Sequence, residues 1–351
     1  MRIVFTLASL GPGGAERVVS LLANKMDGMG HQVEIVCLKF NDVYYQTNDN
    51  VKVTLAMQQT TNHLTELFWL RKHIKQEKPD VVIAFTEGVY CFTIAALLGT
   101  KIPVIASERL DPACMSWQRN LLKKILLPHA SWLVVQTEYI KRYFKGKVGR
   151  MTSIILNPVN EKVFKLPTGK KENIIISVAR LYPQKNQAML IEAFAKIAPE
   201  FPQWRLVIYG EGPERAELES KICLLQLKDR VSLPGRCQTV IEEMNKAKVF
   251  ALSSDYEGMS NAMIEAVCVG LPIVSTHVSG TEELVKEGMN GYVVEKSDVE
   301  SMTKAFERLM GNEQLLESFG AESKRMAEQF RLDTVVNEWL KLIDNVTKNN
   351  G

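Results

Sequence analysis

Residues 174–186 of this 351-residue chain read IIISVARLYPQKN, and residues 1–17 read MRIVFTLASLGPGGAER. Each stretch begins with an apolar run, passes through a turn marked by Gly or Pro, and enters a segment with helical periodicity. The same order recurs along most of the chain. Strands that alternate with helices in this way form parallel sheets with helices on both faces, so we predict an α/β fold.

The alternation starts twice, which predicts two domains. The first series predicts strands at 33–38, 51–57, 81–85, 104–107, 133–136 and 153–156, with helices at 15–29, 64–77, 90–98, 116–127 and 138–145. After a polar stretch at 167–173, the second series predicts strands at 174–178, 206–209, 249–252, 273–275 and 292–294, with helices at 186–198, 213–226, 238–246, 259–269 and 280–287. We therefore expect doubly wound, Rossmann-like domains at 1–165 and 166–330 that face each other across a cleft. A helical tail at 331–351 is expected to cross back to the first domain.

The composition, with 46% hydrophobic and 24% charged residues, is ordinary for a folded protein and excludes disorder, collagen and coiled coil. No apolar run approaches the roughly 20 residues of a membrane-spanning helix. The opening residues predict a strand and not a secretory leader, so we expect a cytoplasmic location. The six cysteines are scattered and the histidines lack metal-binding spacing, which predicts isolated core thiols and no metal site.

The net charge of +3 is unevenly distributed, because residues 1–165 carry +8 and the remainder carries −5. Within the first part, residues 119–150 carry +7 with apolar and aromatic residues interleaved. Two interpretations of this segment stay open. One is a solvated helix face, and the other is a surface that binds the anionic inner face of the cell membrane. No nucleic-acid partner is expected.

Three turns follow predicted strands, where open α/β sheets bind their ligands. Gly13 and Gly14 lack side chains and would let backbone amides approach an anion. Arg180 and Lys185 bring a planar guanidinium and an ammonium to one strand end, which suits a diphosphate, although two surface cations are the alternative. Gly210 belongs to a third turn, for which ordinary turn chemistry is the alternative.

Residues 254–266 read SDYEGMSNAMIEA and are the richest of these segments. Glu257 precedes a predicted helix and Glu265 lies about two turns inside it, so the two carboxylates cannot form a close catalytic pair. They are better placed to hold different hydroxyls of one extended ligand. A capping Glu and a structural Glu are the alternative. The helix start also offers the backbone amides of Gly258, Met259 and Ser260.

The spacing of Glu257 and Glu265 completes a wider pattern that includes Gly270-Leu271-Pro272-Ile273-Val274, Ser279-Gly280-x-x-Glu283, the Arg180/Lys185 pair and Gly13-Gly14. Taken in this order along nearly the whole chain, the pattern resembles the GT4-type retaining glycosyltransferases of the GT-B fold. It is most similar to those that act on bacterial surface polysaccharides. The resemblance implies that the second domain holds a nucleoside-diphosphate sugar, with UDP as the expected carrier, and that the first domain holds the acceptor.

The resemblance also implies roles for individual residues. Arg180 and Lys185 would bind the diphosphate and Glu257 the donor sugar, which makes these three the expected catalytic residues. Glu265 would bind the ribose, and Gly13-Gly14 would approach the phosphates. The remaining implied donor contacts are Gly210, Gly258, Met259 and Ser260. The chain departs from the pattern at Glu108-Arg109, where relatives often carry His after Ser-Glu, and Arg109 is expected to contact a donor phosphate or an anion of the acceptor.

The implied reaction is transfer of a hexose or N-acetylhexosamine, with retention of configuration, to a lipid-linked or oligosaccharide acceptor in polysaccharide or glycan assembly. The expected partners are the nucleotide-sugar donor and a saccharide or polyprenyl-diphosphate-linked acceptor, with no metal and no cofactor. Two alternatives remain open: a GT-B nucleotide-sugar epimerase, and a two-lobed sugar-binding protein without catalysis.

Overall fold

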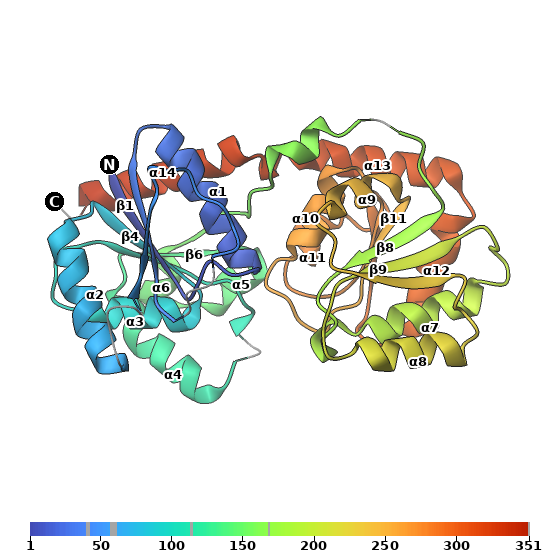
Figure 1. Ribbon diagram of the computed structural model, residues 1–351, viewed down its shortest axis with the longest axis horizontal. Coiled ribbons are helices and arrows are strands. Elements are labelled where there is room, and N and C mark those ends of the chain that lie inside the picture. The colour runs from blue at the N-terminus through green and yellow to red at the C-terminus, as the bar shows by residue number, and fades with distance from the viewer. Residues whose placement is uncertain (40–42, 57–61, 113–114, 168, 350–351) are drawn as a thin grey trace. The chain divides into compact units, whose positions relative to one another are not determined.

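The computed structural model describes residues 1–39, 43–56, 62–112, 115–167 and 169–349. Contacts divide the chain into unit 1, which comprises Met1–Asn160 and Arg331–Gly351, and unit 2, which comprises Glu161–Phe330 (Figure 1). Each unit contains one sheet, and every strand pair that the structure describes is parallel. The predicted α/β fold of two Rossmann-like domains is confirmed.

Unit 1 contains a seven-stranded sheet in the order β3-β2-β1-β4-β5-β6-β7. Its strands are β1 (Arg2–Leu7), β2 (Gln32–Cys37), β3 (Lys52–Leu55), β4 (Val81–Phe85), β5 (Val104–Ser107), β6 (Trp132–Val135) and β7 (Thr152–Ile154). Its helices are α1 (Gly14–Gly28), α2 (His63–Glu77), α3 (Glu87–Leu97), α4 (Trp117–Leu126), α5 (Glu138–Tyr143), α6 (Gly146–Arg150) and α14 (Leu332–Asn349), with a short 3₁₀ helix at Leu127–His129. Met57, the last residue of a predicted strand, lies outside the described residues.

Both faces of this sheet are buried, because alternate residues of each strand point to opposite sides. Phe5 of β1 belongs to the core that includes residues of α1 and α14, whereas its neighbour Val4 belongs to the core with α2 and α3. The C-terminal helix is part of this unit, since the fully buried Trp339 of α14 stacks on Phe85 with 5.9 Å between ring centroids. The indole and the phenyl ring together bury a large apolar area that anchors α14 to the first sheet.

Unit 2 contains a six-stranded sheet in the order β10-β9-β8-β11-β12-β13, which is the Rossmann order. Its strands are β8 (Ile174–Val178), β9 (Arg205–Tyr209), β10 (Val231–Gly235), β11 (Val249–Leu252), β12 (Ile273–Thr276) and β13 (Gly291–Val294). Its helices are α7 (Gln187–Ile197), α8 (Arg215–Leu224), α9 (Val240–Lys246), α10 (Asn261–Cys268), α11 (Thr281–Leu284), α12 (Val299–Met310) and α13 (Glu313–Met326), with 3₁₀ helices at Glu161–Lys165, Pro183–Lys185 and Ala327–Phe330.

Several local features differ from the predictions, and the helix predicted at 280–287 covers only Thr281–Leu284. β10 has no counterpart among the predicted strands. It is an edge strand that contains Pro234 and, among the described strands, pairs with β9 alone. Proline is tolerated there because one side of an edge strand needs no ladder partner. The prediction that the cysteines are core thiols is correct for Cys37, Cys91 and Cys268, but it is wrong for the exposed Cys223 and the half-buried Cys237. Cys114 lies outside the described residues.

Candidate functional site

In unit 2, the predicted donor-binding residues gather at the carboxyl ends of neighbouring strands. β8 and β11 pair directly, and β9 lies on the other side of β8. The loop after β8 carries Arg180 and Lys185, and the loop after β11 carries Glu257. Because the strands are parallel, these loops emerge at the same edge of the sheet, which is where α/β proteins bind ligands.

Lys185 and Glu257 form an ion pair between these two loops. Their side chains are only 14% and 10% exposed. The hydroxyl of Ser254 also donates a hydrogen bond to Oε1 of Glu257, at 2.8 Å. A buried carboxylate is costly unless it is paired and hydrogen-bonded, and here Glu257 has both a cation and a hydroxyl donor. The sequence motifs predict Lys185 and Glu257 in one site, but they reveal neither the ion pair nor the hydrogen bond from Ser254.

Further hydrogen bonds join the two loops. Ser253 Oγ donates to the carbonyl of Lys185 at 2.8 Å, and the amide of Asp255 donates to the carbonyl of Gln184 at 2.9 Å. The side chain of Gln184 in turn donates to the carbonyl of Tyr256 at 2.7 Å. These bonds hold the Lys185 ammonium and the Glu257 carboxylate at fixed backbone positions, so the pair is preorganised.

The first turn of α10 lies directly after Glu257. Ser260 caps this helix by accepting a hydrogen bond from the amide of Met263, at 3.3 Å. Gly280, with φ +87°, packs against Gly258 and Met259, so a Cβ at position 280 would lie 3.2 Å from the Gly258 carbonyl oxygen. Gly258, Met259, Ser260 and, two turns along, Glu265 are all buried.

Arg180 is exposed, and its guanidinium carbon lies 5.0 Å from the ring centroid of Tyr182. Gly210 follows β9 and lies against the loop that carries this arginine. A Cβ at Gly210 would be 1.9 Å from the carbonyl oxygen of Ala179, and its φ of +148° also requires glycine. Gly210 therefore shapes the backbone just before Arg180.

In unit 1, Glu108 and Arg109 follow β5 and are both buried. The hydroxyl of Tyr90 donates to Oε2 of Glu108 at 2.8 Å, and the ammonium of Lys123 lies 3.3 Å from the same oxygen. Burial and the Glu108 charge raise the pKa of Tyr90 well above 10.0, so this phenol stays a hydrogen-bond donor. Lys123 is 2% exposed, which corrects its assignment to the basic surface of 119–150.

Arg109 is a buried cation, and one edge of its guanidinium has no hydrogen-bond partner among the described residues. Nη1 donates to Asn157, and Cζ lies 4.3 Å from the ring centroid of Phe85. Nε and Nη2 have no hydrogen-bond partner among the residues that the structure describes. Burial lowers the pKa of Arg109 to about 9, with Glu108 opposing the shift. Nε and Nη2 are the pair of donors that binds a carboxylate or phosphate in bidentate fashion.

Gly13 and Gly14 lie at the amino end of α1 in unit 1. Gly13 is the N-cap residue of this helix. The carboxylate of Glu16 lies against it, and a Cβ at Gly13 would be 2.0 Å from Oε2 of Glu16. The structure thus puts Gly13, Gly14, Glu108 and Arg109 in unit 1, whereas the other predicted site residues belong to unit 2.

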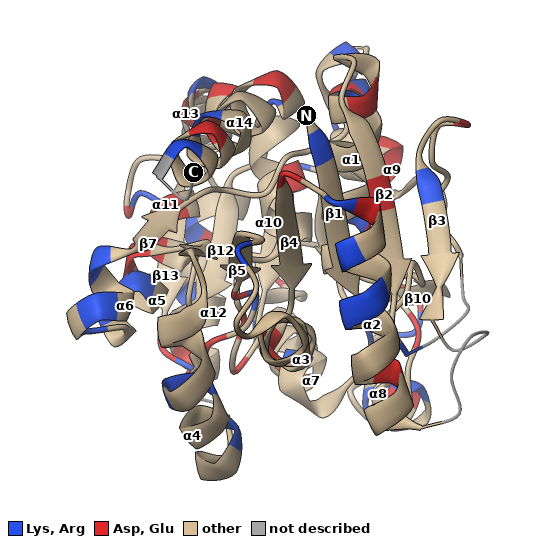
Figure 2. Cartoon of the chain, turned by 90° about the vertical axis from the view of Figure 1, so that its left-hand side faces the viewer, with Lys and Arg blue, Asp and Glu red and all other residues tan. Residues whose placement is uncertain are grey.

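The basic segment of unit 1 forms α4, α5 and α6, on which Lys and Arg are prominent (Figure 2). Trp117 is 72% exposed, and Leu121, Leu122, Ile125 and Tyr143 are also exposed. A cavity of about 870 Å³ with a mostly apolar lining lies in this region and includes Trp117, Phe144 and Lys145 in its walls. No helix among the described residues is long and apolar enough to span a membrane.

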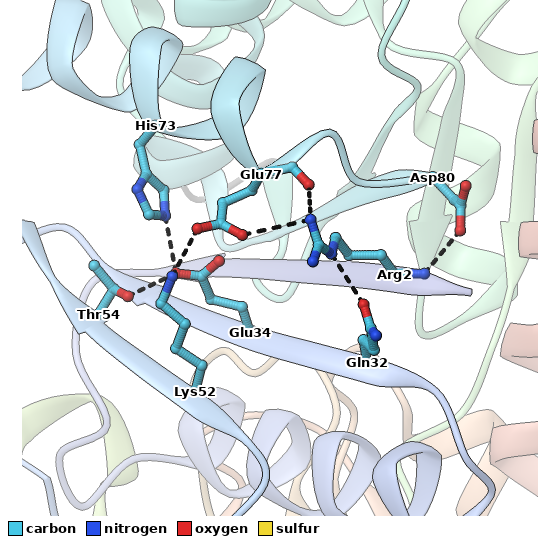
Figure 3. Close-up of polar contacts among 8 residues, drawn as sticks. All are labelled: Arg2, Gln32, Glu34, Lys52, Thr54, His73, Glu77 and Asp80. Carbon is cyan, nitrogen blue, oxygen red and sulfur yellow. Dashed lines mark hydrogen bonds and ion pairs between the residues drawn. The ribbon is translucent and has the colours of Figure 1, made fainter.

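One group of side chains has the chemistry of a metal site (Figure 3). Ligand atoms of Glu34, His73 and Glu77 lie within 4.8 Å of one another. The ammonium of Lys52, however, lies 2.7 Å from Glu77 and 3.3 Å from Glu34, and Thr54 donates to Glu34 at 2.6 Å. These cation and hydroxyl partners already satisfy the carboxylates. We therefore interpret the group as a network of ion pairs and hydrogen bonds that connects β2, β3 and α2.

Comparisons with known proteins cover nearly the whole chain. The family model described as Glycosyltransferase Family 4 matches residues 12–163, and the one described as Glycosyl transferases group 1 matches residues 158–326. A Campylobacter jejuni protein named "GalNAc-alpha-(1->4)-GalNAc-alpha-(1->3)-diNAcBac-PP-undecaprenol alpha-1,4-N-acetyl-D-galactosaminyltransferase" is 30% identical, with 99% of each chain covered. The amylovoran biosynthesis glycosyltransferase of Erwinia amylovora is 24% identical, covering 95% of this chain and 96% of its own.

Solved structures share the fold. The Anabaena protein HepE, solved in complex with UDP, superposes with a TM-score of 0.85 and 19% sequence identity, covering 98% of this chain and 100% of HepE. A Thermosynechococcus elongatus sucrose-phosphate synthase gives a TM-score of 0.82 at 18% identity, with 99% of both chains covered. Identities this low bear on the architecture alone.

Proposed function

This chain belongs to the family 4 glycosyltransferases, and on that premise we propose that it is a retaining enzyme that transfers a hexose or N-acetylhexosamine from a UDP-sugar to a lipid-linked saccharide acceptor. Unit 2 binds the donor in this proposal, and unit 1 binds the acceptor. The observation that carries it is the preorganised Lys185–Glu257 pair, held by Ser254 at the start of α10. The UDP complex of HepE supports the choice of carrier, and the undecaprenol-linked substrate in the C. jejuni name supports the acceptor class.

The chemistry assigned to each donor-site residue follows from its charge. Lys185 and Arg180 neutralise the diphosphate as it leaves, and they do so without the reorganisation that water would need. Glu257 accepts hydrogen bonds from sugar hydroxyls, and Glu265 accepts them from the ribose. The backbone amides at Gly258, Met259 and Ser260 precede α10 and would add to the positive end of its dipole. No divalent metal is required in this scheme.

A panel of nucleotide sugars tests the donor assignment. UDP-sugars should raise the Tm more than the other nucleotide sugars of the panel. The shift is measurable, because a ligand at 100 times its dissociation constant adds about 2.7 kcal/mol to the free energy of unfolding. Glu265→Ala should weaken UDP and UDP-sugar alike, whereas Glu257→Ala should lower kcat and sugar discrimination while leaving UDP affinity intact. Equal loss of UDP affinity in both variants would contradict this division. Turnover that needs no acceptor would instead indicate an epimerase.

We assign Arg109 to an anionic group of the acceptor, such as the diphosphate that links a saccharide to its lipid. Its Nε and Nη2 edge suits bidentate binding of one phosphate. Arg109→Lys keeps the charge but loses the planar fork, so it should raise the acceptor KM about tenfold or more without changing the donor KM. A donor KM that rises instead would reassign Arg109 to the donor phosphates.

We also propose that α4, α5 and α6 bring the enzyme to anionic lipid, where such an acceptor is anchored. Exposed Trp117 and Ile125 can enter the interface while Lys and Arg attract the headgroups, each contributing roughly 1 kcal/mol. Vesicle sedimentation tests this with a variant that converts Lys124, Arg142 and Lys145 to Glu. The variant should lose binding to acidic but not neutral vesicles. If the wild type and the variant sediment equally with acidic vesicles at low salt, the membrane role is refuted and the segment is a solvated helix face.

A further inference from the structure

A second cavity of unit 2 lies away from the loops described above. It has a volume of about 300 Å³, and its charged lining residues are Lys171, Lys248, Lys324, Glu313 and Glu317. Lys171 and Lys248 precede β8 and β11, so they lie at the amino ends of strands whose carboxyl ends carry Arg180, Lys185 and Glu257. The cavity and the candidate donor site are therefore at opposite edges of the same sheet.

The cavity wall is built by close contact between α13 and the turn that follows α10. A Cβ at Gly320 of α13 would lie 2.7 Å from the carbonyl oxygen of Gly270. Gly270 has φ +75°, and the methylene groups of Lys324 cover it, with Cε 2.7 Å from the position of a Cβ there. Both glycines are thus needed for α13 to pack against the turn after α10. This close packing holds the methylene chain of Lys324 at a fixed place in the cavity wall.

The three lysines differ in how they are paired. Lys248 forms an ion pair with Glu313 at 2.7 Å. The ammonium of Lys171 is shielded from solvent and has no hydrogen-bond partner among the described residues. Burial, together with the nearby charge of Lys324, lowers the pKa of Lys171 to about 8. At neutral pH this group is still mostly protonated, and a shielded ammonium next to a like charge costs free energy unless an anion accepts its hydrogen bonds.

We propose that the pocket of Lys171, Lys248 and Lys324 binds a small phosphate-bearing anion, which bridges the ammonium groups of Lys171 and Lys324. The volume accommodates inorganic phosphate or a small phosphate monoester. Glu313 and Glu317 at the cavity disfavour polyphosphates, because they leave the five charged groups with a net charge of only +1. The anion connects the segment before β8 to α13 and so stabilises the docking of that helix in unit 2.

The test measures inorganic phosphate binding to the full chain in a Lys185→Ala background, which removes one of the two cations of the candidate donor site. Thermal shift and calorimetry should detect binding in this background. Adding Lys171→Met should weaken it about tenfold, the scale of one charge-assisted hydrogen bond, and Lys171→Arg should retain it. Lys228→Met, at an exposed lysine elsewhere in unit 2, is the matched control and should change nothing. Glycerol phosphate and UMP, compared with phosphate, distinguish a free anion from a monoester as the preferred ligand.

A second readout does not depend on folding stability. Competitive acetylation followed by mass spectrometry should show that phosphate protects Lys171 more than Lys228 and raises the pH at which Lys171 reacts. Without phosphate, Lys171→Met should be at least as stable as the parent, since it removes a shielded charge. Phosphate binding that is unchanged by Lys171→Met, or no protection of Lys171 at saturating phosphate, would overturn the proposal. Loss of UDP binding in Lys171→Met alone would also overturn it, because that would connect Lys171 to the donor site instead.

Discussion

Removing the ammonium of Lys185 should destabilise unit 2 even in the absence of any substrate. Lys185→Ala leaves the Glu257 carboxylate, whose side chain is 10% exposed, without its cation. Breaking a buried ion pair in this way costs about 3–5 kcal/mol. Glu257 keeps the 2.8 Å hydrogen bond from Ser254 and some contact with water, so we expect a smaller cost of about 2 kcal/mol. For a unit of this size that corresponds to a fall in Tm of roughly 4–8 °C.

A double-mutant cycle isolates the pair from other effects of the substitution. The cycle compares wild type, Lys185→Ala, Glu257→Gln and the double variant by urea denaturation without ligand. Because Glu257→Gln removes the charge that Lys185 compensates, Lys185→Ala should cost at least about 1 kcal/mol less in that background. Lys228→Ala serves as the control for loss of an exposed lysine and should be neutral.

The same variant should lose catalysis by a separate mechanism. Loss of a preorganised cation at a leaving diphosphate should raise the activation free energy by about 2–4 kcal/mol. The value of kcat/KM should therefore fall roughly 30- to 1,000-fold. Additive stability changes across the cycle would refute the reasoning that the pair stabilises the unliganded protein. Wild-type kcat/KM in Lys185→Ala would refute the assignment of Lys185 to the leaving group.

Three further predictions follow from other parts of the structure. Gly210→Ala should destabilise unit 2 and weaken UDP binding together, because its Cβ would overlap the carbonyl of Ala179; calorimetry and a UDP titration measure both, and an unchanged Tm would contradict it. Burial raises the pKa of Glu34, but hydrogen bonds from His73 and Thr54 more than offset this and hold it below 4.5. Glu34 therefore stabilises the fold above that pH and loses this contribution as the pH falls through its folded pKa, so Glu34→Gln should flatten the acid limb of a plot of Tm against pH. Turnover should survive EDTA, and activity that returns only with added magnesium would contradict a mechanism in which protein cations balance the leaving charge.

Most elements could be predicted from the sequence because the pattern is local. The buried strands at 81–85, 104–107, 174–178 and 249–252 occur at the predicted residues, since central parallel strands are continuous apolar runs. β10 could not be recognised in this way, because an edge strand is only partly buried and its sequence includes Pro234. Its place is set by pairing with β9 and not by its own composition.

The candidate site was predictable as a set of residues but not as a set of contacts. Lys185 and Glu257 are both recognisable from local motifs, yet 72 residues separate them and only the pairing of β8 with β11 brings their loops together. The same limit explains Lys123, which follows the pattern of a basic helix face but turns inward to the buried Glu108. A one-dimensional pattern shows that a charge is present, whereas its partner depends on the neighbouring element.

By itself the sequence determined the two βα series, the turns after their strands and the order of the motifs that identify the family. These properties depend on apolar periodicity and on glycine, both of which act over a few residues. Only the tertiary structure decided the pairing of Glu257, the shielded ammonium of Lys171 and, among the described residues, the lack of a partner for one guanidinium edge of Arg109. The physical reason is that desolvation and hydrogen bonding depend on atoms supplied by distant segments, so the state of a charge follows from packing rather than from its neighbours along the chain.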